Sequence, residues 1–133
     1  MKLRAWMAGG LLVLVGCAST PGGLRNDPEA RRVMVLDVGY QTVLKRLVDW
    51  QAECVAGPLV PIGQVINDVQ HYPDTRSASI VRGAMGMGTQ IFEVIDLREI
   101  SPGKTEMTFF AKASTDTRAA AKRRIAEGDS RCP

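Results

Sequence analysis

The spacing of hydrophobic residues changes along the chain, and its clearest segment predicts a helix. From Tyr40 to Val55, apolar residues recur at steps of three and four, and charged residues mostly occupy the other side. This spacing is typical of an amphipathic helix of about sixteen residues. Asp37 or Gly39 can cap its start, and Gly57-Pro58 can end it.

Four later segments have the pattern of strands, and turn sequences separate them. Pro73 suits a type I turn, and Ser101-Pro102-Gly103-Lys104 fits a type II turn, with Pro at its second position and Gly at its third. Strands joined by turns of this kind predict an antiparallel meander. The four segments are residues 65–70, 77–84, 89–100 and 104–113.

A short apolar run and a second helix flank this meander. The run Arg32-Val33-Met34-Val35-Leu36 favours a leading strand. Ser114 or Thr115 can cap a helix that continues to about Glu127, where Gly128 is a natural stop. The sequence therefore predicts one α+β domain over residues 31–133, an antiparallel β-meander of four or five strands with two helices packed on one face.

The first seventeen residues have a different pattern. A basic start, Met1 to Arg4, precedes an apolar run from Ala5 to Val15, and Leu14-Val15-Gly16-Cys17 closes it. The run is shorter than the roughly 20 residues that a membrane-spanning helix needs. A short apolar run after basic residues is typical of a signal peptide. The four residues that end at Cys17 resemble the lipobox of bacterial lipoproteins; the alternative is an ordinary secretory signal in which Cys17 stands by chance.

This resemblance implies that residues 1–16 are removed as a signal peptide and that Cys17 carries a diacylglyceryl group and usually an N-acyl chain. Ala18, rather than Asp, follows the cysteine. By the same resemblance, this favours a lipid anchor in the outer membrane, on its periplasmic side. Residues 18–29 are rich in Ser, Thr, Pro, Gly and Asn, so we expect residues 17–30 to be the lipidated cysteine and a flexible tether.

The remaining cysteines, Cys54 and Cys132, are an even pair. In an oxidising compartment such a pair favours a disulfide. The alternatives are two free thiols or a metal pair, although a metal site usually has three or four ligands and His71 is the only histidine. The mature part also resembles, in outline, small single-domain proteobacterial envelope lipoproteins with a cysteine in the first helix and another near the C-terminus. That resemblance implies no particular activity.

The charge of the chain argues against nucleic acid as a partner. The sequence has 17 Lys and Arg against 14 Asp and Glu, and removal of Lys2 and Arg4 with the signal leaves 15 against 14. A nucleic-acid-binding domain would show a concentrated basic face with aromatic residues. A net charge of about +1 and few aromatic residues do not fit that class.

No catalytic constellation stands out, so we expect no enzyme, no metal and no other cofactor. The glycine-rich residues 83–88 lack the order of a dinucleotide or phosphate loop and predict a hairpin bend. His71 lies near Asp68 and Asp74, but no nucleophile motif accompanies them. Three carboxylates of the longest strand are expected on a solvated face: Glu93, Asp96 and Glu99.

Two features are candidate contact surfaces. Phe109 and Phe110 are adjacent, so an extended strand points them to opposite faces. If helices cover one face only, Phe110 is exposed and can begin a contact patch; the alternative is that the second face is covered too, by the loop 57–63 for example. Lys122-Arg123-Arg124 is either a solvated helix face or a contact with anionic lipid headgroups.

These observations together favour a lipid-anchored envelope protein that binds another envelope component, such as a protein, or supports an assembly. One alternative is a carrier of a small ligand or lipid, with a pocket between the first helix and the sheet. A third class is a small hydrolase that uses His71 with Asp68 or Asp74.

Overall fold

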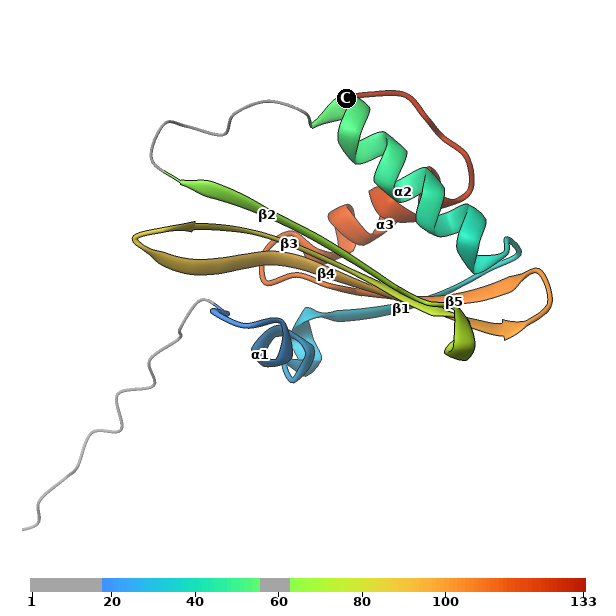
Figure 1. Ribbon diagram of the computed structural model, residues 1–133, viewed down its shortest axis with the longest axis horizontal. Helices are drawn as coiled ribbons and strands as arrows, with labels where there is room; N and C mark the ends of the chain where they lie inside the picture. The colour runs from blue at the N-terminus through green and yellow to red at the C-terminus, as the bar shows by residue number, and fades with distance from the viewer. Residues whose placement is uncertain (1–17, 56–62) are drawn as a thin grey trace, which may run out of the picture.

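A five-stranded antiparallel sheet forms the centre of the protein, seen here in a computed structural model that describes residues 18–55 and 63–133 (Figure 1). The strand order is β1-β5-β4-β3-β2, so the last four strands form a meander and β1 joins it beside β5. This arrangement confirms the predicted α+β fold. The strands are β1 (Arg31–Leu36), β2 (Gln64–Tyr72), β3 (Ser77–Gly86), β4 (Gly88–Ser101) and β5 (Lys104–Phe110).

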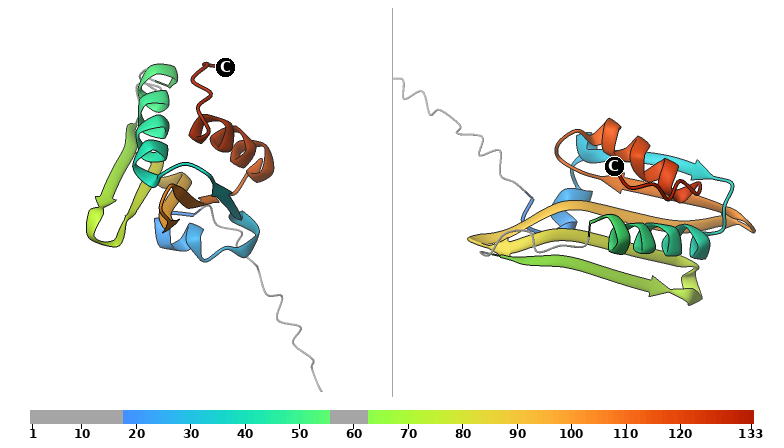
Figure 2. Two further views of the ribbon diagram at one scale, coloured as in Figure 1. Left: turned by 90° about the vertical axis from the view of Figure 1, so that its right-hand side faces the viewer. Right: turned by 90° about the horizontal axis from the view of Figure 1, so that it is seen from above.

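The two long helices, α2 (Tyr40–Cys54) and α3 (Thr115–Ala126), lie on the same face of the sheet, as predicted (Figures 1 and 2). The main core fills the space between these helices and the sheet. Phe109 is fully buried in it, on the face that the alternation of β5 assigns to the core. Other members of this core are Leu36, Val43, Leu47, Ile80, Ile95, Leu97, Met107, Ala119 and Ile125.

The opposite face of the sheet is covered by a short helix, α1 (Pro21–Arg25), and a 3-10 turn, η1 (Pro28–Ala30) (Figure 1). The prediction of a flexible tether over this segment was therefore wrong for its described part. Leu24 is 0% exposed and packs with Val81, Val94 and Phe110. The hydroxyl of Thr20 accepts a hydrogen bond from the Gly23 amide at 3.0 Å, which caps α1.

The difference in length between β4 and β5 explains where the N-terminal segment is attached. β4 has 14 residues and β5 has seven, so β5 leaves the first part of β4 without a partner on that side. The Ile91 amide there donates to the carbonyl oxygen of Ala18 at 3.1 Å. At the other end of the segment, the Ala111 amide donates to the carbonyl oxygen of Ala30, also at 3.1 Å. Residues 18–30 are thus fixed to the sheet at both ends.

A bulge between β3 and β4 changes which face the side chains of β4 occupy. Arg82 pairs with Glu93, whereas Gly83 pairs with Ile91, so Phe92 is the extra residue. Glu93 therefore shares a face with the main core, while Ile91 packs on the α1 face. A Cβ at Gly83 would lie 2.2 Å from the carbonyl oxygen of Gln90, so the close approach of the two strands requires glycine here.

The turns mostly follow the prediction. Residues 83–88 contain the end of β3, the start of β4 and the bend between them, so the predicted hairpin is confirmed. Gly103 has a φ of 74°, the value expected at the third position of the predicted type II turn. Pro73–Thr75 forms a 3-10 helix, η2, in place of the predicted type I turn.

The predicted disulfide between Cys54 and Cys132 is confirmed. The two Cα atoms are 5.2 Å apart, within the range that a disulfide bridges. The indole of Trp50 also donates to the carbonyl oxygen of Arg131 at 3.1 Å, so the C-terminal tail is held along α2. Within residues 18–55 and 63–133, no helix has the length and apolar character to cross a bilayer.

Candidate functional sites

The predicted contact residue Phe110 is buried, so the prediction of an exposed aromatic patch there was wrong. Its side chain is 5% exposed because α1 and η1 cover this face of the sheet. The alternative prediction, a covered second face, is correct, but the cover comes from residues 18–30. The loop 57–63, suggested for that role, lies almost wholly outside the described residues.

The basic cluster on α3 is divided between the core and the surface. Lys122 is 8% exposed, and its Nζ lies 2.9 Å from Glu93 Oε1 and 5.1 Å from the centre of the Trp50 ring. A headgroup contact for Lys122 was therefore a wrong prediction. Arg123 and Arg124 are exposed, with Arg123 paired to Glu127 on the same helix. Their proposed contact with headgroups stays a prediction.

Glu93 is the centre of a buried charge cluster, which we define as Glu93, Arg82, Arg118 and Lys122. Glu93 was expected on a solvated face but is 4% exposed. Its carboxylate oxygens lie 2.8 Å from Arg82 Nη1, 2.9 Å from Arg118 Nη2 and 2.9 Å from Lys122 Nζ. Three cations thus surround one carboxylate, and the cluster joins β3, β4 and α3.

The electrostatics of the charge cluster make it a poor catalytic site. Burial alone raises the pKa of Glu93, but Lys122, Arg82 and Arg118 together lower it below the ordinary value. Burial lowers the pKa of Arg82 and of Lys122, against the opposing effect of Glu93. A carboxylate with a lowered pKa is a weak general base. The arrangement is better suited to holding strands and helix together.

Among the described residues, the space between α2 and the sheet offers little room for a ligand. The main core fills most of it, and a cleft of about 160 Å³ remains at one end, lined in part by Val65, Arg82 and Phe92. Ligand pockets for drug-sized molecules occupy roughly 300–1,000 Å³. The carrier alternative is therefore weakly supported by this part of the fold.

His71 contacts an aromatic hydroxyl rather than an acid. Its Nε2 lies 3.0 Å from Tyr40 Oη, and the two rings are 5.6 Å apart. Asp68 instead accepts a hydrogen bond from the Gln70 amide group at 3.0 Å. In the part of the chain that the structure describes, no hydrogen bond or ion pair joins His71 to Asp68 or Asp74. The hydrolase alternative thus lacks the required base–acid pair.

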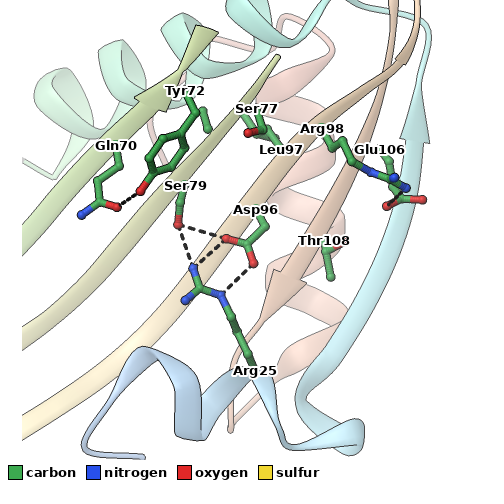
Figure 3. A pocket seen from close by; sticks show the side chains of 11 residues that line it. Arg25, Gln70, Tyr72, Ser77, Ser79, Asp96, Leu97, Arg98, Glu106 and Thr108 are labelled. Carbon is green, nitrogen blue, oxygen red and sulfur yellow. Dashed lines mark hydrogen bonds and ion pairs between the residues drawn. The ribbon is translucent and has the colours of Figure 1, made fainter. Parts of the chain in front are cut away.

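A polar groove of about 390 Å³ lies on the face of the sheet that carries α1 (Figure 3). Arg25 reaches into it from α1 and makes two hydrogen bonds to Asp96, each of 2.8 Å. Ser79 accepts from Arg25 at 2.9 Å and donates to Asp96 at 3.0 Å. The other lining residues are Gln70, Tyr72, Ser77, Ala78, Leu97, Arg98, Glu106 and Thr108.

The charges of the polar groove are balanced. Arg25 pairs with Asp96, and Arg98 pairs with Glu106 at 3.1 Å, so its two cations face two anions. The remaining surface comes from hydroxyl groups, the amide group of Gln70, the exposed ring of Tyr72, and Ala78 and Leu97. This lining favours an uncharged polar ligand that forms hydrogen bonds and stacks on an aromatic ring. Sequence patterns missed the groove because Arg25 comes from the segment expected to be a tether.

No protein-family model matches the chain, and no curated protein sequence is significantly similar to it.

Proposed function

We propose that the protein is a lipid-anchored component of the cell envelope, held in the outer membrane and facing the periplasm, with a non-enzymatic binding role. The observation that carries this proposal is the sequence Leu14-Val15-Gly16-Cys17 after a short apolar run. The thiol of Cys17 would carry the diacylglyceryl group through a thioether, and cleavage before Cys17 would free its amine for an N-acyl chain. Two or three acyl chains hold a protein firmly on a bilayer, because each buried CH₂ contributes about 0.8 kcal/mol.

The polar groove is the part of the domain best suited to the binding role. It is open, charge-balanced and rich in hydrogen-bonding groups, and Arg25 is held in it by Asp96 and Ser79. We assign to it an uncharged polar stretch of another envelope protein. The alternatives have less support, because among the described residues the core leaves a cleft of about 160 Å³ under α2, and because Glu93 and His71 have no catalytic partners there.

Metabolic labelling with an alkyne-bearing fatty acid tests the anchor. The wild-type protein should be labelled and should sediment with outer membranes, and Cys17→Ser should lose both properties. The matched control is the double variant Cys54→Ser/Cys132→Ser, which lacks the other two cysteines and should still be labelled. A Cys17→Ser protein that remains labelled and membrane-bound would contradict the proposal.

A photo-crosslinking amino acid at Tyr72 tests the binding role in the intact envelope. Tyr72 borders the polar groove and has an exposed ring, so a bound protein should be captured there. The control position is Glu53, an exposed residue of α2. Capture should also be reduced by Ser77→Tyr, because the larger side chain fills the groove. Equal capture from both positions, unaffected by Ser77→Tyr, would contradict a role for the groove.

A further inference from the structure

One end of the sheet carries exposed apolar side chains with no covering element among the described residues. Met87 is fully exposed at the tip of the β3–β4 hairpin, Met85 is 45% exposed beside it, and Phe92 is 42% exposed at the bulge of β4. We call these three residues the hairpin end. Single exposed apolar residues are common on protein surfaces, so a group of them indicates a function only where a second observation supports it.

The second observation is the position of the N-terminal segment. The carbonyl oxygen of Ala18 accepts from the Ile91 amide, directly beside Phe92 in the chain. Figures 1 and 2 show the first described residues and the β3–β4 hairpin at the same end of the sheet. Cys17 precedes Ala18, and consecutive Cα atoms are about 3.8 Å apart. A lipid on Cys17 is thus attached beside the hairpin end, without an intervening tether.

The reach of the hairpin matches the depth of a membrane interface. Ile91 and Gly88 are three residues apart on β4, which corresponds to about 10 Å of strand. The tip therefore extends roughly that far beyond the attachment of Ala18. The headgroup region of a leaflet is about 5–7 Å thick, and apolar surfaces of interfacial proteins enter about 5–10 Å.

We infer that the hairpin end is a membrane-contacting surface, in which Met85 and Met87 enter the leaflet that holds the lipid of Cys17, while Phe92, one residue beyond Ile91 on β4, lies at the surface of that leaflet. This inference rests on the proposed lipid anchor. It adds a second point of contact, and a second contact fixes the orientation of the domain relative to the bilayer.

The surroundings of Ala18 favour apolar contact over attraction to charged headgroups. A hollow of about 380 Å³ beside Ala18 is lined by Ile91, Phe92, Lys112 and Arg118 among others. Its two cations have partners, because Lys112 Nζ lies 3.3 Å from Asp27 and Arg118 Nη2 lies 2.9 Å from Glu93. The contact should therefore depend little on anionic lipid.

A fluorophore that reports its polarity, placed at Met87→Cys, tests the inference. The lipidated full chain offers one free thiol in this variant, because Cys54 and Cys132 are bonded and Cys17 carries the lipid. The control is Ile100→Cys, an exposed apolar position at the opposite end of β4. Each protein is placed in phosphatidylethanolamine vesicles that contain lipids with brominated acyl chains, with and without phosphatidylglycerol.

The label at residue 87 should shift its emission to the blue and be quenched by the brominated lipid, whereas the label at residue 100 should show neither change. Removal of phosphatidylglycerol should leave the quenching unchanged. A lipidated, vesicle-bound protein whose label at residue 87 is unquenched would overturn the inference and leave the anchor standing. Quenching that requires phosphatidylglycerol would overturn the apolar contact. A protein whose Cys17 carries no lipid by mass spectrometry would overturn both proposals.

Discussion

Replacing Glu93 by Gln removes the carboxylate that Arg82, Arg118 and Lys122 share, and nearly preserves its shape. Glu93, Arg82 and Lys122 are all buried. Loss of one partner from a buried ion pair costs about 3–5 kcal/mol, because the remaining charge is left without compensation. Glutamine still offers one acceptor oxygen, so we expect Glu93→Gln to cost about 3 kcal/mol of a total stability of roughly 5–15 kcal/mol.

The matched control is Lys122→Met, which removes a cation and keeps a side chain of similar length. Glu93 retains two cations in this variant. Burial of the charged Lys122 is unfavourable, as the lowered pKa of Lys122 shows, and the variant no longer carries that cost. The contact of Lys122 with the Trp50 ring is lost, which costs about 1–2 kcal/mol because Lys122 is buried. We therefore expect Lys122→Met to cost about 1–2 kcal/mol, less than Glu93→Gln. In the double variant, Lys122→Met should restore part of the stability that Glu93→Gln removes.

Urea unfolding followed by circular dichroism, on the chain from residue 18 onward with its disulfide intact, measures these differences. At unchanged slope, a lower midpoint reports lost stability. If Glu93→Gln costs less than about 1 kcal/mol, or if Lys122→Met costs as much as Glu93→Gln, the Glu93 carboxylate does not stabilise the fold by compensating the buried cations.

The same experiment has a pH dependence with a definite sign. The three cations hold the pKa of Glu93 in the folded protein below its ordinary value, in spite of the opposing effect of burial. The stabilisation is therefore complete above the ordinary glutamate pKa of about 4.3 and is lost as the pH falls through the lower, folded value. The difference in stability between wild type and Glu93→Gln should shrink in that acidic range and stay constant near neutral pH.

Three further substitutions test the fold. Cys54 and Cys132 are 78 residues apart, and replacing both by Ser should cost about 4 kcal/mol by the chain-entropy relation. This cost should appear as a lower urea midpoint, and the midpoint of the variant should no longer change when reductant is added. Leu24→Ala should cost about 2–5 kcal/mol, because this side chain is fully buried against the sheet; an unchanged urea midpoint would contradict its burial. Gly83→Ala should lower the yield of soluble, folded protein, because an added Cβ would lie 2.2 Å from a carbonyl oxygen of β4, whereas Gly22→Ala meets nothing within 4 Å and should not.

Most of the regular structure was predictable because its hydrophobic periods are long and distinct. The helix from Tyr40 onward shows more than three turns of one apolar stripe, and the strands alternate with turn residues between them. The disulfide was predictable because an even pair of cysteines remained after Cys17 was assigned to the lipid. In each of these cases, local sequence and global fold agree.

The residues that the prediction misplaced are of two kinds: Leu24 depends on a contact that no local period reveals, whereas Glu93 and Lys122 stand at positions whose spacing indicates burial. Leu24 is one buried apolar residue in a polar segment of Pro and Gly, and a five-residue helix has no period to detect. Its burial depends on the free second face of a sheet that forms far along the chain. Glu93 was placed on a solvated face, although it lies two residues from Ile95, which is buried in the main core. Lys122 carried a similar signal, since it lies three residues from both Ala119 and Ile125 on one side of α3.

The packing of residues 18–30 also changes how the proposed anchor and the proposed groove are related. A flexible tether would let the domain move freely above the membrane, whereas a lipid attached next to Ala18 is joined to the sheet through the Ile91 amide. From Ile91 to Arg98, which lines the polar groove, β4 extends seven residues, or about 23 Å. The strands of a sheet are rigid over this length, so the anchor would hold the groove at a fixed distance from the lipid-bearing end. The same N-terminal segment supplies Arg25 to the groove, so attachment to the membrane and formation of the binding surface depend on one folded element.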